Sequence, residues 1–247
     1  MAALGFWLLG LLAWPLLFWQ ARRARSNTPR LPEAPGIRRG AAGRHGPRRR
    51  IRFLGDSPIA GVGVRRYADS LPARLVHGLA ERGRCRLAWS VQAATGARLR
   101  DHVPPPHEAA SPPETLVLSF GVNDVTGMTS VRAWRRQLQG LLDARVGGML
   151  VVLGVPPMAA FSALPWPLNR WLGWRARMLD ASTAELLSER TDALFVPVPP
   201  IRDPRLLAAD GFHPSALGAE RWAEAILAVI PDAKWWAVLD SNQRPAD

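Results

Sequence analysis

The chain has 247 residues, of which 48% are apolar, and its 23 Pro and 21 Gly are spread along it without repeats. This composition suits one folded domain with additional segments at its ends, and it excludes collagen-like and low-complexity proteins. The net charge of +12 is concentrated in residues 22–52, which hold eleven arginines against one acid, Glu33, so the remainder is nearly neutral. The only cysteine, Cys85, excludes an intrachain disulfide.

Residues 1–21 carry no charged side chain and are almost wholly apolar. Their length is close to the ~20 residues that span a bilayer, and the arginines follow the apolar run, whereas a cleaved signal peptide has positive charge before it. We therefore expect an uncleaved N-terminal membrane anchor. The position of the arginines favours a domain on the cytoplasmic side, with a periplasmic or extracellular domain left open. The alternatives are a helix lying in the membrane interface or a start assigned too early.

Residues 22–50 are rich in Pro, Gly and Arg, and we interpret them as a basic linker. Because an apolar segment precedes them directly, attraction to anionic lipid headgroups explains their charge better than binding to nucleic acid, which we consider an unlikely partner.

Residues 51–231 alternate between short apolar runs and segments of helical period, which predicts one α/β domain. The expected strands are 51–54, 86–91, 115–120, 148–155 and 193–196, and the main expected helices are 65–82, 129–146 and 215–230. Continuously apolar strands are typical of a parallel sheet buried on both faces. The prediction is a three-layer α/β/α sandwich with a five-stranded parallel sheet in the flavodoxin-like order 2-1-3-4-5. Residues 232–247 have no clear period and are expected to form a tail outside the core.

Polar residues follow four of the expected strands. Ser57 ends the first, Gly96 follows the second, Asn123 follows the third, and an Asp-Gly-Phe-His sequence (Asp210 to His213) comes after the last. Since the carboxyl ends of parallel strands meet at one edge, these residues indicate a ligand site there. Alone, Ser57 is better explained as a helix cap. Asp210 and His213 alone could be metal ligands, but no Cys, His or Glu cluster accompanies them.

Together and in this order, these sequences resemble the four marker blocks of the SGNH (GDSL-type) hydrolases, over about residues 51–230. The strongest block is Asp-Gly-Phe-His-Pro-Ser-Ala-Leu-Gly, which opens the last helix. The resemblance implies the SGNH hydrolase fold and a serine esterase that needs no cofactor and no metal. It also implies Ser57 as nucleophile, His213 as base and Asp210 as the group that orients the base.

The resemblance further implies an oxyanion hole made by the Ser57 N–H, the Gly96 N–H and the Asn123 amide. Pro58 agrees with this arrangement. In an α/β-hydrolase elbow the residue after the nucleophile donates its N–H to the oxyanion, and proline has none. Here the serine itself would donate, so proline is tolerated.

An aromatic-rich stretch, residues 156–178, follows the fourth strand. We expect Met158, Phe161 and Trp166 from it to contact the substrate, although ordinary core packing explains such residues equally well. The expected activity is hydrolysis of an acyl ester (lipid, lysophospholipid, thioester or short acyl ester) through an acyl-enzyme on Ser57. The alternative is a membrane-tethered binding module with the same fold and no turnover.

Overall fold

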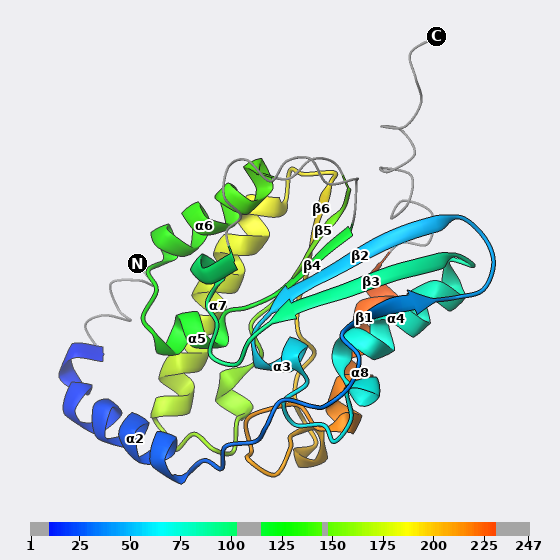
Figure 1. Ribbon diagram of the computed structural model, residues 1–247. Helices are drawn as coiled ribbons and strands as arrows, with labels where there is room; N and C mark the ends of the chain where they lie inside the picture. Colours follow the sequence, from blue (N-terminus) through cyan, green and yellow to red (C-terminus); the bar gives the residue numbers. More distant parts are fainter. Residues whose placement is uncertain (1–9, 103–114, 145–147, 231–247) are drawn as a thin grey trace.

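A computed structural model describes residues 10–102, 115–144 and 148–230 of the chain (Figure 1). Its centre is a six-stranded sheet in the order β1-β3-β2-β4-β5-β6. The strands are β1 (Arg39–Ala42), β2 (Arg48–Gly55), β3 (Arg86–Ala93), β4 (Thr115–Ser119), β5 (Leu150–Leu153) and β6 (Ala193–Val196). The predicted α/β fold with a parallel sheet is confirmed, because β3, β2, β4, β5 and β6 are parallel neighbours in the predicted order.

The sixth strand, β1, corrects the sequence analysis. It pairs antiparallel with β3, Arg39 opposite Ser90, and so extends the sheet by one edge strand. Both β1 and the first residues of β2 lie within residues 22–50, so the linker prediction is wrong for these segments. The sequence of β1, Arg-Gly-Ala-Ala, has neither β-branched residues nor apolar alternation, the two signals by which a strand is recognised.

Helices cover both faces of the sheet (Figure 1). On one face α4 (Leu71–Arg82) packs with α8 (Ala216–Val229), and on the other α6 (Val131–Asp143) packs with α7 (Leu168–Leu187). Successive residues of a strand point to opposite faces. Accordingly Val117 of β4 belongs to the core under α4 and α8, whereas Leu116 and Leu118 belong to the core under α6 and α7. The predicted three-layer sandwich is thereby confirmed.

Short helical segments connect the main elements, and two of them carry polar residues to the carboxyl edge of the sheet. These segments are α3 (Ser57–Ala60), α5 (Val122–Thr126) and the 3-10 turns η1 (Tyr67–Asp69), η2 (Leu99–His102), η3 (Met158–Ala160) and η4 (Pro204–Leu206). α3 starts directly after β2, and α5 starts directly after β4, its neighbour in the sheet. Ser57 and Asn123 therefore leave the sheet side by side, in the middle of its carboxyl edge.

One further helix, α2 (Trp14–Asn27), lies outside the three layers and packs on α7 (Figure 1). Leu17 is buried there, and Gln20 donates from Nε2 to the Trp166 carbonyl at 2.8 Å and accepts from the Leu168 N–H at 3.2 Å. Within the described ranges, no helix has the length and apolar character needed to cross a membrane. The predicted anchor over residues 1–21 is thus not supported: residues 14–27 form one helix that already includes three arginines. Residues 1–9 and the predicted tail, 232–247, lie outside the described residues.

Candidate active site

Ser57, His213 and Asp210 meet at the carboxyl edge of the sheet. Ser57 is the first residue of α3, and the other two come from the loop before α8. His213 Nε2 lies 2.9 Å from Ser57 Oγ, and His213 Nδ1 lies 2.5 Å from Asp210 Oδ2. The imidazole therefore bridges the hydroxyl and the carboxylate, an arrangement that can move a proton from serine to histidine.

The Asp210 carboxylate is held in its ionised form. It is buried, and Oδ1 accepts the N–H groups of Phe212 and His213, both at 3.0 Å. Burial raises the pKa of Asp210, but the hydrogen bonds from the His213 ring and from these two backbone N–H groups outweigh it, so the pKa lies below its ordinary value. An ionised acceptor at Nδ1 favours the tautomer that carries its proton there, which leaves Nε2 free to accept the Ser57 hydroxyl proton.

The backbone of the Asp210–His213 loop needs its glycine. Gly211 has φ of +64°, and a Cβ added there would lie 2.3 Å from Ser162 Oγ. The loop is closed by the Ala208 N–H, which donates to the His213 carbonyl at 2.8 Å. Gly211 thus permits a tight turn that aims both side chains at one point.

Asn123 lies beside the nucleophile, but its amide is already engaged. Nδ2 donates to Asp56 Oδ2 at 2.9 Å and to the Ala97 carbonyl at 3.1 Å, which accounts for both of its hydrogens. Gly96 directly precedes Ala97. Asn123 therefore connects the residue before Ser57 with the loop that carries Gly96, and brings the three predicted oxyanion donors into one region.

Gly96 faces open space, since a Cβ added there would meet no protein atom within 4 Å. Its φ of +86° is what favours glycine at this position.

Asp56 is the most perturbed acid of the site. Its carboxyl group is buried, and burial, followed by repulsion from Asp124, raises its pKa to about 8 against the lowering effect of its hydrogen bonds. Asp56 is therefore mainly protonated at neutral pH. Its side chain accepts a hydrogen bond from Asn123, which is 67 residues away in the sequence.

Sequence reasoning missed Glu33. Its Oε1 accepts the Thr95 N–H at 2.9 Å and the Thr95 hydroxyl at 2.8 Å, while its Oε2 pairs with Arg38 at 2.8 Å. Burial raises the pKa of Glu33, but the hydrogen bonds from Arg38 and Thr95 outweigh this effect, so the pKa lies below its ordinary value. Glu33 thus fixes the residue before Gly96. The available signal was its position as the only acid among eleven arginines.

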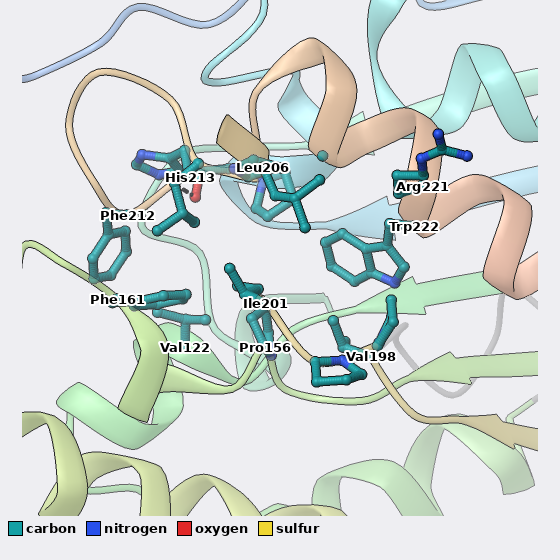
Figure 2. A pocket seen from close by; sticks show the side chains of 17 residues that line it. Val122, Pro156, Phe161, Val198, Ile201, Leu206, Phe212, His213, Arg221 and Trp222 are labelled. Carbon is teal, nitrogen blue, oxygen red and sulfur yellow. Dashed lines mark hydrogen bonds between the residues drawn. The ribbon is translucent and has the colours of Figure 1, made fainter. Parts of the chain in front are cut away.

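An apolar cavity of about 290 Å³ opens beside Ser57 and His213 (Figure 2). His213 lies at one end and Trp222 at the other, with Ile201 between them. Its wall is formed by Ser57, Pro58, Val122, Pro156, Phe161, Val198, Pro199, Pro200, Ile201, Leu206, Leu207, Phe212, His213, Pro214, Gly218, Arg221 and Trp222. The wall is almost entirely hydrophobic, which suits the binding of an apolar group.

Of the three residues expected to contact substrate, only Phe161 lines this cavity. Met158 is wholly buried, because η3 turns its side chain into the core, and Trp166 is 75% exposed on the turn before α7. The rest of the wall comes mainly from residues 198–207 and from α8. The available signal was a Pro-rich apolar run directly after the last parallel strand, at the same edge as Ser57.

The metal-ligand alternative finds no support in this geometry. Asp210 and His213 use their oxygen and nitrogen atoms on each other, on backbone N–H groups and on Ser57. Across residues 10–102, 115–144 and 148–230, no three His, Cys, Asp or Glu side chains gather as a metal site.

Comparison with known proteins gives one family and one fold. The model of the GDSL-like lipase/acylhydrolase family matches residues 53–221, more than half of the chain. A curated GDSL-like esterase of Mycobacterium tuberculosis is 28% identical over 243 aligned positions, which cover 88% of this chain and 76% of that protein.

Solved structures show the same fold. A lipase from a goat rumen metagenome, Lip_vut3, superposes with a TM-score of 0.56 at 16% identity, over 73% of this chain and 96% of that one. A family 3 carbohydrate esterase of Clostridium thermocellum superposes with a TM-score of 0.55 at 15% identity, over 79% and 96% of the two chains.

Proposed function

This chain belongs to the GDSL-like lipase/acylhydrolase family and is an ester hydrolase, and we propose that it acts through a covalent acyl-enzyme on Ser57. The observation that carries the proposal is the His213 ring, 2.9 Å from Ser57 Oγ and 2.5 Å from Asp210 Oδ2. A serine hydroxyl is a weak nucleophile and needs such an oriented base.

In the acylation step, His213 Nε2 takes the hydroxyl proton while Ser57 Oγ attacks the ester carbonyl carbon. The carbonyl oxygen becomes an oxyanion. When the tetrahedral intermediate collapses, the bond to the alcohol oxygen breaks and His213 gives its proton to that oxygen. Water then attacks the acyl-enzyme, with its proton taken by His213, and the second collapse returns that proton to Ser57 and releases the acid.

The oxyanion would be stabilised by donors at the end of β2 and in its neighbouring loops. As the first residue of α3, Ser57 has a backbone N–H without an intrahelical acceptor. The Gly96 N–H and Asn123 Nδ2 are the further proposed donors. For Asn123 to take part, Nδ2 must redirect one of its two present hydrogen bonds, those to Asp56 and Ala97.

We infer that the preferred acyl group is an apolar chain long enough to occupy the cavity between Ser57 and Trp222 (Figure 2). Each methylene transferred from water to such a wall contributes about 0.8 kcal/mol. This corresponds to roughly a fourfold rise in kcat/KM for each added carbon until the cavity is full. An acetyl group would leave most of the cavity empty.

The test is a series of p-nitrophenyl esters from acetyl to longer linear acyl chains, hydrolysed by the wild type, Ser57→Ala and Ser188→Ala. Ser188 is an exposed serine at the end of α7 and serves as the matched control. We expect kcat/KM to rise with chain length, to fall roughly 10³-fold or more in Ser57→Ala, and to be unchanged in Ser188→Ala. Full activity of Ser57→Ala would contradict the mechanism, and an acetyl optimum would contradict the substrate class.

A further inference from the structure

The outer face of α2 is an exposed apolar surface. Among the described residues, most of the exposed large hydrophobic side chains come from residues 11–19: Leu11, Leu12, Trp14, Leu16, Phe18 and Trp19. Trp166, 75% exposed, is joined to α2 through the Gln20 hydrogen bond to its carbonyl. These seven side chains are called the α2 patch below. Large apolar side chains that gather in this way on a protein surface mark an interaction site.

The α2 patch is distinct from the side of α2 that packs on the domain. α2 already packs on α7 through Leu17 and holds the α7 start through Gln20. Leu11 and Leu12 precede α2, and the other exposed side chains of residues 11–19 lie on its remaining surface. Trp14 and Phe18 stack on each other, with 5.7 Å between ring centroids. α2 lies at the edge of the domain (Figure 1), and its packing on α7 holds the exposed side chains in place.

Arginines follow the apolar half of α2 along the same helix. Arg22 lies over the Phe18 ring at 5.8 Å and Arg23 over the Trp19 ring at 5.3 Å, and Arg25 is exposed beside them. The first acidic residue of the whole sequence is Glu33, so α2 contains no acid to neutralise them. The helix thus has an apolar half and a positively charged half.

We propose that α2, together with Trp166, docks the domain on an anionic lipid surface. The apolar half would enter the boundary between headgroups and acyl chains, and the arginines would meet lipid phosphates. Docking of this kind requires amphipathic character rather than membrane-crossing length. The charge argues against a second copy of this chain as occupant, because a second α2 contains no acidic side chain to pair with the arginines, whereas lipid phosphates do pair with them.

The α2 patch is connected to the cavity by one short segment. Phe161 in the cavity wall and Trp166 in the patch are five residues apart, and Leu168 begins α7, on which α2 packs. Docking would therefore hold the cavity-bearing segment near lipid. If the proposed function holds, the bound enzyme would act on esters within the membrane. The docking itself does not depend on the proposed function.

The test uses the full chain and vesicles of phosphatidylcholine, alone or mixed with phosphatidylglycerol, with binding measured by co-sedimentation. Two variants alter the proposed surface, Phe18→Ser/Trp19→Ser and Arg22→Gln/Arg23→Gln. Two matched controls remove equally exposed groups elsewhere, Ile37→Ser/Val229→Ser and, on α6, Arg132→Gln/Arg136→Gln. Hydrolysis of a water-soluble ester and a thermal melt check that each variant is folded.

We expect the wild type to bind the anionic vesicles and to dissociate as salt is raised. The Arg22/Arg23 double variant should bind about 30-fold more weakly, since each arginine near an anionic surface contributes about a factor of five. The Phe18/Trp19 double variant should also lose binding, and both controls should bind as the wild type does.

Absence of wild-type binding to the anionic vesicles would overturn the proposal, as would equal losses in the variants and their controls. Dimerisation that disappears in Phe18→Ser/Trp19→Ser, without vesicle binding, would instead assign the α2 patch to a second copy. An enzyme inactive on all esters that still binds vesicles through these residues would refute the proposed function and leave the docking intact.

Discussion

Asn123 donates its side-chain amide to the buried Asp56 carboxyl group at 2.9 Å, and so connects the residue before Ser57 with the helix that follows the neighbouring strand. The second hydrogen of the same amide goes to Ala97, next to Gly96. These two hydrogen bonds hold Asn123 beside Ser57 before a substrate arrives, and one of them is redirected when Nδ2 meets an oxyanion. Asp56 acts in this arrangement as a positioning residue for Asn123.

Removing the amide should have a larger effect than removing the group that positions it. We expect Asn123→Ala to lower kcat about 10²–10³-fold, the usual cost of a lost oxyanion donor. Asp56→Ala removes one hydrogen bond to that donor and should lower kcat roughly tenfold. Steady-state kinetics on one soluble ester measures both, with little change expected in KM. Equal rates for Asn123→Ala and the wild type would exclude Asn123 from the oxyanion hole.

The buried Asp56 carboxyl group should make the fold less stable as pH rises. In the unfolded chain Asp56 ionises near the ordinary aspartate pKa of 3.8, whereas in the folded protein its pKa is about 8. Between these values the folded state holds one more proton, so this contribution to the free energy of unfolding is fully present below pH ~4 and decreases by up to ~1.4 kcal/mol per pH unit as pH rises towards 8.

Asp56→Asn isolates this effect because it keeps the shape and removes the titration. Urea unfolding of both proteins from pH 5 to 8 should show the difference in unfolding free energy, wild type minus variant, falling as pH rises. Asp180, whose pKa is raised by burial to about 6, is present in both proteins, so its titration cancels in the difference. Parallel stability curves would mean that Asp56 does not titrate in this range.

Glu33 should matter for catalysis although it lies in a segment that resembles a linker. Glu33→Ala removes the acceptor for both Thr95 donors, and we expect kcat to fall about fivefold as the Gly96 loop loses its support. Glu33→Gln keeps an acceptor oxygen and should recover much of the rate. Glu81→Ala, an exposed acid on α4, is the matched control. A full rate in Glu33→Ala would show that the loop holds its position without Glu33.

Filling the cavity should change specificity without changing the chemistry. Ile201 lies in the cavity wall between His213 and Trp222 (Figure 2), and Ile201→Trp places a larger side chain there. We expect kcat/KM for an octanoyl ester to fall at least tenfold, while the acetyl ester is hydrolysed at the wild-type rate. Acetyl hydrolysis serves as the internal control for folding. A uniform loss across chain lengths would place the acyl chain elsewhere.

The parallel sheet could be predicted because β4 and β5 are almost wholly apolar and the strands alternate with amphipathic helices. Ser57 and Asn123 could be located because each comes within a few residues of a strand end, and Asp210 and His213 because their sequence resembles a marker block of the family. β1 could not, since Arg-Gly-Ala-Ala carries no strand signal and becomes a strand by pairing with β3.

Contacts between distant parts of the chain were beyond sequence reasoning for the same reason. The hydrogen bonds of Glu33 to Thr95 and of Asn123 to Asp56 span more than 60 residues and leave no periodic pattern. The apolar run at the N-terminus predicts a membrane anchor. Its periodicity does not reveal that Gln20 joins α2 to the start of α7. Likewise, Met158 and Trp166 could not be assigned to the core or the surface without the turn that orients them.

The most direct test of the central claim is covalent labelling by a fluorophosphonate, followed by mass spectrometry of the labelled peptide. The account predicts one adduct per chain, on Ser57, with hydrolysis lost in proportion to labelling. It also predicts much slower labelling in His213→Ala, which lacks the base 2.9 Å from the hydroxyl. A folded wild-type enzyme that hydrolyses esters while Ser57 remains unlabelled would contradict the acyl-enzyme mechanism.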